Sequence, residues 1–92
     1  MVWKEFWGVE YFSCPDDTYT TFEIFETKEK ALDFFNELQR ENRAYELFTQ
    51  KLNTDYIYYE DNGELNYEDN HNLYDWKSRQ SWIVNTWLCP EY

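Results

Sequence analysis

Aromatic side chains make up 23% of this 92-residue chain, and their burial is the strongest constraint on its fold. Each Phe, Tyr or Trp can bury about 150–250 Å², so a short chain can still build a rigid core. The chain also carries 19 Asp and Glu against eight Lys and Arg, a formal charge of -11. Acidic chains of this kind are usually disordered because they lack apolar mass. Here the rings supply that mass, and we expect one acidic domain over residues 1–92 that holds its charge in a fixed pattern.

The first half of the chain predicts an antiparallel hairpin followed by a helix. Residues 2–12 and 19–26 have strand character, with a Pro- and Asp-containing turn at residues 13–17. Thr27 has the chemistry of a helix N-cap. Apolar residues then follow at helical spacing, namely Ala31, Phe34, Phe35 and Leu38. We expect this helix to end near Asn42 and to pack on the sheet.

The second half of the chain predicts further strands. Residues 45–51 fit either a continuation of the helix or a strand after a break at residues 41–43, and the strand is favoured. Residues 55–60 have strand propensity, and Asn62-Gly63 predicts a type I′ turn that returns the chain over residues 64–69.

The C-terminal part of the chain is harder to assign. Residues 70–81 are polar and give no clear pattern, and residues 82–88 fit a strand or a buried tail. The sum is an α+β fold with a small antiparallel sheet, roughly β-β-α-β-β, and one main helix packed on it.

The stretch from residue 52 to residue 76 contains seven carboxylates, five Tyr and no Lys or Arg. Opposed positions in a strand pair lie about 4.5–5.5 Å apart, so like charges repel there, and folding gives no reason to collect them. Tyrosine rings between the acids would provide a stiff backing. A simple solvated hairpin is the commoner explanation of a single charge run. The carboxylates are Asp55, Glu60, Asp61, Glu64, Glu68, Asp69 and Asp75.

A second row of acids recurs every fourth residue along the predicted helix. Successive members lie about 6 Å apart on one face. The row consists of Glu29, Asp33, Glu37 and Glu41. It is flanked by Lys28, Lys30, Arg40 and Arg43, so ion pairs within the helix explain some of these acids.

Other kinds of site find little support in the sequence. The single histidine, His71, lies among acids and asparagines and is more typical of a surface residue than of a general base. No cofactor or metal ion is expected, and we do not expect an enzyme. Direct nucleic-acid binding requires a basic surface that the composition lacks. The two cysteines, Cys14 and Cys89, are expected to be reduced thiols, since no membrane span or secretory signal is evident and a cytoplasmic location is expected.

In its short length, acidity, aromatic content and acidic, Tyr-rich segment over residues 55–69, the chain resembles the small phage-encoded DNA mimics that block host defence nucleases. These proteins share a charge layout more than a sequence motif. The resemblance implies a homodimer in the host cytoplasm that occupies the DNA-binding surface of a restriction endonuclease such as McrBC. The eleven carboxylates of the two acidic sets would then stand for phosphates. The basic segment at residues 77–79 departs from this pattern and would lie at a subunit contact or on the back face.

Two other classes of function remain open from the sequence. An acidic immunity or antitoxin protein also places acids against a basic nuclease, but through a partner-specific patch with aromatic anchors. An enzyme or a sugar-binding module would need a pocket with convergent polar groups.

Overall fold

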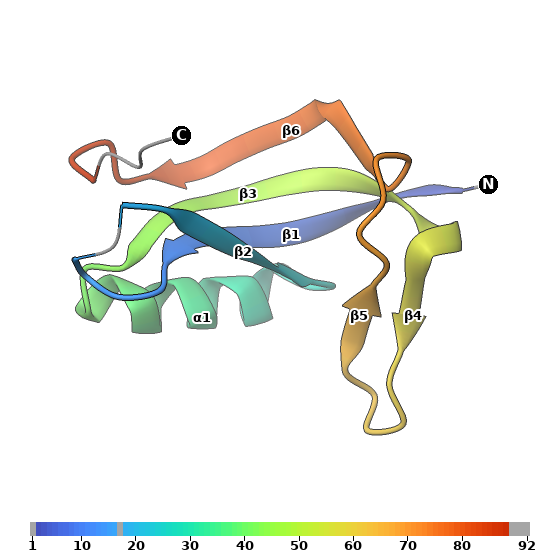
Figure 1. The fold of residues 1–92 in the computed structure, drawn as a ribbon, viewed down its shortest axis with the longest axis horizontal. Helices are drawn as coiled ribbons and strands as arrows, with labels where there is room; N and C mark the ends of the chain where they lie inside the picture. Colours follow the sequence, from blue (N-terminus) through green and yellow to red (C-terminus); the bar gives the residue numbers. More distant parts are fainter. Residues whose placement is uncertain (1, 17, 89–92) are drawn as a thin grey trace.

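A computed structural model of the protein describes residues 2–16 and 18–88. It contains one long helix and two antiparallel sheets (Figure 1). The order is β1 (Trp3–Phe12), β2 (Thr20–Phe25), α1 (Lys28–Arg40), β3 (Ala44–Asn53), a 3-10 turn η1 (Thr54–Tyr56), β4 (Ile57–Tyr59), β5 (Leu65–Tyr67) and β6 (Tyr74–Val84). The main sheet has the strand order β2-β1-β3-β6, and β4 and β5 form a separate two-stranded sheet. The predicted α+β class with one main helix is confirmed.

The helix begins and ends on identifiable signals. The Thr27 hydroxyl accepts a hydrogen bond from the Lys30 amide at 3.3 Å, so Thr27 is the N-cap as predicted. The helix ends at Arg40, two residues before the expected end. Glu41 is the C-cap, and Asn42 adopts a positive φ of 58°, a conformation that stops a helix.

Two hydrophobic clusters lie on opposite faces of the main sheet. Val9 belongs to the cluster beneath α1, whereas Phe6 belongs to the other, and residues of odd and even position on a strand point to opposite faces. The first cluster contains the helix residues Ala31, Phe35 and Leu38. The second receives Ile57, Leu65 and Tyr67 from the small sheet. The helix therefore covers one face, and the base of the β4–β5 hairpin covers part of the other.

The β4–β5 hairpin differs from its predicted geometry in two ways. The strand expected over residues 55–60 is shortened to Ile57–Tyr59, because the Asn53 side chain accepts a hydrogen bond from the Asp55 amide at 3.0 Å and starts the 3-10 turn. The type I′ turn is wrong as well: Gly63 has a φ of 82°, but Asn62 does not have a positive φ. The Gly63 amide donates to the Glu60 carbonyl at 2.8 Å, which makes a three-residue loop with glycine at its left-handed position.

An eleven-residue strand, β6, runs through residues 74–84 and thus includes most of the segment 70–81, which has no clear sequence pattern. The strand pairs with β3 through an irregular register, and the Ser78 hydroxyl replaces a backbone group by accepting from the Lys51 amide at 2.8 Å. Ser78 thus satisfies one β3 amide at a point where the pairing of the two strands is irregular. The buried tail considered for residues 82–88 is wrong, since Trp82 and Trp87 are exposed. Cys14 is exposed, and Cys89 lies outside the described residues.

No helix in the described ranges is both long enough and apolar enough to cross a membrane.

Candidate functional site

The base-free acidic stretch forms the β4–β5 hairpin and the segments that flank it. Six of its seven carboxylates are exposed, and only Asp75 on β6 is half-buried. The ion pairs within residues 2–16 and 18–88 join Lys4 to Glu26, Arg43 to Glu41, and Arg79 to Glu10 and Glu46. None of them involves an acid of the base-free stretch. In the described part of the chain, these carboxylates therefore carry their charge without a Lys or Arg partner.

The hairpin extends from the main sheet (Figure 1), and aromatic side chains hold it against β2. The ring of Tyr67 stacks on Phe22 of β2, with centroids 6.4 Å apart and planes 8° apart. The Tyr59 hydroxyl donates a hydrogen bond to Glu26, just after β2. At the base of the hairpin, the Glu68 amide donates to the Tyr56 carbonyl at 2.9 Å. These contacts fix the direction in which the hairpin extends beyond the sheet.

The five tyrosines of the stretch divide into two groups. Tyr56, Tyr67 and Tyr74 are half-buried and pack on the core, while Tyr58 and Tyr59 are exposed near the acids. Burial raises the pKa of Tyr67, and the nearby charges of Glu23 and Asp69 raise it further. Burial also raises the pKa of Tyr74. Both hydroxyls stay protonated at neutral pH, so the negative charge of the surface comes from the carboxylates.

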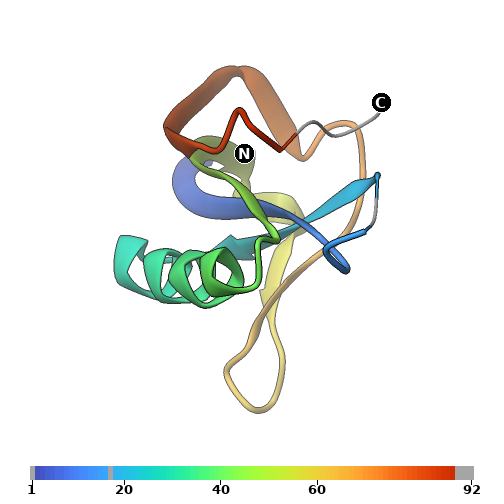
Figure 2. The same ribbon diagram turned by 90° about the vertical axis from the view of Figure 1, so that its left-hand side faces the viewer.

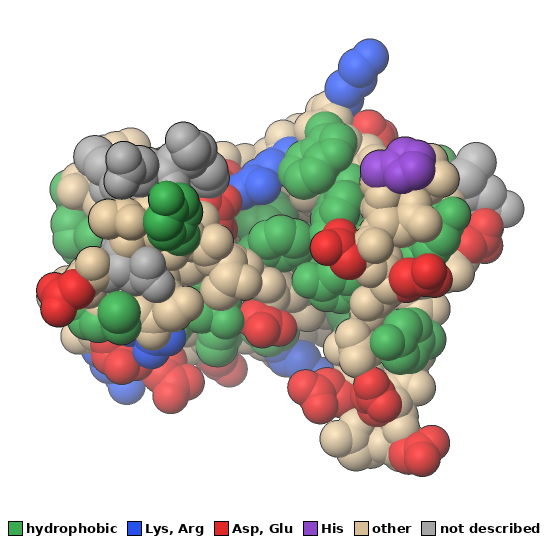
Figure 3. All heavy atoms as spheres, in the orientation of Figure 1, with side chains coloured by type: hydrophobic (Ala, Val, Ile, Leu, Met, Phe, Trp, Pro, Cys, Tyr) green, Lys and Arg blue, Asp and Glu red, His purple; other side chains and the backbone are tan. Residues whose placement is uncertain are grey.

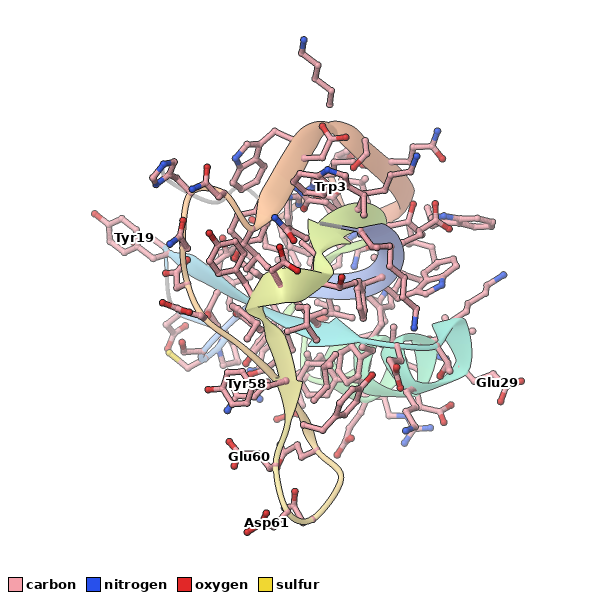
Figure 4. The ribbon with its side chains drawn as sticks, turned by 90° about the vertical axis from the view of Figure 1, so that its right-hand side faces the viewer. Trp3, Tyr19, Glu29, Tyr58, Glu60 and Asp61 are labelled. Atoms are coloured by element: carbon pink, nitrogen blue, oxygen red, sulfur yellow. The ribbon has the colours of Figure 1, made fainter. Side chains whose placement is uncertain are left out.

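Glu60 and Asp61 lie at the tip of the hairpin (Figure 4) and face a hollow between the hairpin and β2. The hollow has a volume of about 430 Å³, and its lining includes Glu60, Asp61 and Glu64 together with Glu23 of β2. No Lys or Arg lines it. The sequence does not single out Glu23, because its place beside the tip depends on how the hairpin packs on β2, and no local pattern predicts that packing.

The helix row is shorter than predicted. Glu29, Asp33 and Glu37 are exposed on α1. Glu41 lies beyond the end of the helix and pairs with Arg43 at 3.4 Å, so it is not a free member of the row. The row of four is therefore corrected to a row of three.

The hairpin tip extends past the edge strand β2 toward the start of the helix, so that both lie below the strands of the main sheet in Figures 1 and 2. A second hollow of about 240 Å³ lies between them and is lined by Glu26, Lys30, Tyr59 and Glu64, among others. Lys30 thus interrupts the negative surface between the two acidic elements. Glu23 and Glu26 therefore lie next to the hairpin acids. The acids of the helix form a separate group.

Asp55 and Asp75 lie away from the hairpin tip. Asp55 lines a hollow of about 440 Å³ that also contains His71 and Asn53. No hydrogen bond or ion pair joins His71 to Asp55 in the part of the chain that the structure describes. Asp75 is the second residue of β6 and lies opposite Lys51 of β3. The seven acids of the stretch therefore surround the hairpin and do not form one row.

Two further carboxylates, Glu10 and Glu46, are buried on the other part of the same sheet face and are bridged by Arg79. They border an open hollow of about 590 Å³ that Phe22, Tyr45 and Trp76 also line. A space-filling view shows this hollowed region between the acidic hairpin and the opposite end of the molecule (Figure 3). Both acids have their oxygens bound by Arg79 and by the hydroxyls of Thr20 and Ser81. Glu10 and Glu46 therefore stabilise the fold and are not part of the exposed acidic surface.

No group of three His, Cys, Asp or Glu side chains within residues 2–16 and 18–88 is placed to hold a metal ion. No protein-family model matches this chain, and neither the curated proteins nor the solved structures gave a match.

Proposed function

We propose that this protein is an inhibitor that imitates DNA and binds the phosphate-binding Lys and Arg residues of a host DNA-binding protein, with a restriction endonuclease as the leading class of target. One observation carries the proposal: six exposed carboxylates without a basic partner surround a hairpin that aromatic contacts fix to the core. Repulsion between these acids opposes folding, so their clustering needs a reason outside the fold. A basic partner surface supplies that reason.

The number of acids suits the imitation of one face of a duplex. The longest dimension of the described chain is 38 Å, and one strand of B-DNA carries a phosphate every 3.4 Å, or about eleven over this length. Both strands together would carry about twenty-two. The six exposed acids of the base-free stretch and the three of the helix are nine in number, which is close to the phosphates of one strand. A protein that binds one side of DNA makes about six to ten phosphate contacts, which is within reach of this surface.

A second candidate function rests on Tyr58 and Tyr59. These side chains are exposed among the acids of the hairpin, and exposed tyrosines are typical anchors of partner-specific interfaces. They favour an immunity or antitoxin protein that covers the basic site of a nuclease toxin. Such a protein would use the same acids but would recognise its partner by shape as well as by charge.

A pull-down from host lysate with the full chain, with and without competing duplex DNA, tests the proposal and separates the two candidates. A DNA mimic is displaced by any duplex that fits the target, whereas an immunity protein need not be. Binding to the captured target should weaken by at least about tenfold between 0.1 M and 1 M NaCl, because the Debye length falls from about 10 Å to about 3 Å. A target that binds DNA and this protein at the same time would contradict the proposal, and so would an affinity that salt leaves unchanged.

A further inference from the structure

The open hollow that Glu10 and Glu46 border is the largest feature of the protein surface that the acidic hairpin does not explain. Three aromatic side chains, Phe22, Tyr45 and Trp76, line it together with the two acids and Arg79, and its volume is about 590 Å³. Pockets that hold ligands usually measure about 300–1,000 Å³. We refer to this site as the Trp76 hollow.

Neighbouring rings hold the aromatic wall of the Trp76 hollow in place. The Trp76 ring stacks on Tyr74 with centroids 4.7 Å apart, and Tyr74 meets Phe22 edge-on with centroids 6.0 Å apart. Phe22 in turn stacks on Tyr67 of the hairpin. Trp76 nevertheless remains 60% exposed. The fold therefore fixes a large ring in position and leaves much of it open to a partner.

The Trp76 hollow carries more negative than positive charge. Glu10 and Glu46 supply two carboxylates, and Arg79 is the only Lys or Arg among the described residues that line the hollow. All eight Lys and Arg of the chain lie within the described ranges, and Arg79 alone among them forms an ion pair with either acid. A second cation would therefore balance the formal charge of this group.

Glu46 has acceptor positions for such a cation. Its Oε1 accepts a hydrogen bond from Arg79 and its Oε2 accepts one from Ser81, whereas a carboxylate offers about four acceptor positions. Within the described ranges, about half of the acceptor capacity of Glu46 is thus left for a donor that enters the hollow.

The combination of ring faces and carboxylates suits a guanidinium group. A guanidinium is planar, stacks on aromatic faces and carries several N–H donors that match carboxylate oxygens. Arg79 shows the same pattern inside the fold, since its guanidinium lies 3.8 Å from the centre of the Phe48 ring and donates to two carboxylates. A second guanidinium in the hollow would find a ring and a carboxylate in the same neighbourhood.

We propose that the Trp76 hollow receives an arginine side chain of the target protein, with its guanidinium on the Trp76 ring and its donors directed to Glu46. The partner in this inference rests on the proposed function, because surfaces that bind phosphate groups are rich in arginine. Aromatic residues and arginine in desolvated pockets are typical anchors of protein interfaces. The hollow thus adds recognition of shape to a contact that the hairpin makes by charge.

The position of the Trp76 hollow allows one partner to reach both sites. Phe22 lines the hollow and also packs against the hairpin through Tyr67. The hollowed region and the acidic hairpin lie on the same face of the molecule in Figure 3. A basic surface that binds the hairpin acids can therefore place an arginine in the hollow.

Binding of N-acetyl-arginine amide to the full chain tests the inference without a target. NMR signals of the Trp76 indole N–H and of the Arg79 Nε–H report on the hollow directly. We expect a saturable shift of both signals with a dissociation constant below about 10 mM, as for a weak single-group contact. N-acetyl-citrulline amide has nearly the same shape but no charge, and it should bind at least about fivefold more weakly.

Trp76→Ala and a matched control locate the binding site. Trp76→Ala should raise the dissociation constant of the arginine probe at least about fivefold, measured on the Arg79 signal, because it removes the ring face. Trp87→Ala is the control, since Trp87 is also 60% exposed but is not among the described residues that line the hollow. The control should change the constant by less than about twofold.

The same two variants extend the test to a target captured from host lysate. Trp76→Ala should weaken target binding at least about tenfold, as expected for an aromatic anchor, and Trp87→Ala should weaken it less than about threefold. If Trp76→Ala left the target affinity unchanged, the inference would be overturned while the proposed function of the acidic hairpin still stood.

The arginine probe decides the inference even without a target. No saturable shift, equal binding of the arginine and citrulline probes, or a dissociation constant that Trp76→Ala leaves unchanged would each overturn it. Selective binding of the arginine probe in the absence of any captured target would support the hollow as a guanidinium site and count against the proposed function alone.

Discussion

Glu10 on β1 and Glu46 on β3 lie directly opposite each other, and both are buried, at 6% and 7% exposure. Arg79 of β6 bridges them, with Nη2 at 2.9 Å from Glu10 and 2.7 Å from Glu46. Its guanidinium also lies 3.8 Å from the centre of the Phe48 ring. Burial alone would lower the pKa of Arg79, but the hydrogen bonds to Glu46 and Glu10 outweigh burial and raise it. One cation thus joins three strands and pairs with two buried acids.

Arg79→Gln should therefore destabilise the fold strongly. Removal of one partner from a buried ion pair costs about 3–5 kcal/mol, because the remaining charge stays buried without compensation. Urea unfolding followed by circular dichroism measures the change in the free energy of unfolding. Lys77→Gln on the same strand is the matched control, since Lys77 is exposed, and it should change the stability by less than about 0.5 kcal/mol. Equal effects of the two substitutions would show that the bridge contributes little.

Gly8→Ala should destabilise the main sheet through a clash with Phe48. A Cβ atom at position 8 would lie 2.6 Å from Cε2 of the Phe48 ring, which is buried and cannot move away freely. Overpacking of this kind costs about 1–3 kcal/mol.

The tip of the hairpin provides the comparison for Gly8. Gly63→Ala meets no atom within 4 Å but places a side chain at a φ of +82°, which costs about 1–2 kcal/mol from backbone strain alone. The Phe48→Leu substitution should reduce the cost of Gly8→Ala and leave that of Gly63→Ala unchanged. Unfolding midpoints of Gly8→Ala and Gly63→Ala, each measured with and without Phe48→Leu, check this coupling. If Gly8→Ala cost the same with either residue at position 48, the clash with Phe48 would not be its cause.

The stability of the fold should fall at alkaline pH because of Tyr67 and Tyr74. Burial raises the pKa of each hydroxyl above its usual value of 10.0, so the folded protein keeps these protons where the unfolded chain has lost them. The contribution to stability is complete below about pH 10 and is lost as pH rises through the higher pKa values of the folded state. Urea unfolding at a series of pH values from about 8 to about 11 measures the decline.

Tyr74→Phe should make this alkaline decline shallower, since it removes one of the two groups. Tyr58→Phe is the control, because Tyr58 is exposed, and it should leave the slope as in the parent protein. The prediction fails if the two variants and the parent lose stability along the same curve.

Reversal of the hairpin charges should reduce target binding more than the same change on the helix. Lys at Glu64, Glu68 and Asp69 alters the net charge by six, as does Lys at Glu29, Asp33 and Glu37. The two variants therefore match in overall charge and differ only in position. We expect at least a hundredfold loss of affinity for the hairpin variant and about a tenfold loss or less for the helix variant, in line with the screening of more distant charges.

Surface plasmon resonance against the captured target gives these affinities, and circular dichroism confirms that both variants fold. Equal losses would mean that the target responds to net charge and not to the arrangement of the hairpin acids.

The sequence determined the elements whose signals are local. The β1–β2 hairpin, the Thr27 cap, the apolar stripe of α1 and the strand character of β3 follow from neighbouring residues, and all are present in the structure. It also identified the base-free acidic stretch, because charge and aromatic content are properties of a continuous segment. The type of the hairpin turn could not be predicted from the sequence. Asn62-Gly63 marks the correct position, but the Asn62 side chain accepts a hydrogen bond from the Glu64 amide at 2.9 Å, and this favours the three-residue loop over the type I′ turn.

The tertiary structure alone decided which acids are exposed and which are buried. Glu10 and Arg79 are 69 positions apart and meet only because β1, β3 and β6 share one sheet. The tertiary structure also places the largely polar β6 at the edge of the sheet. It brings Glu23 beside the hairpin tip. A sequence pattern reports on neighbours along the chain, whereas the free energy of a buried charge or an open edge depends on residues that the sheet brings together from a distance.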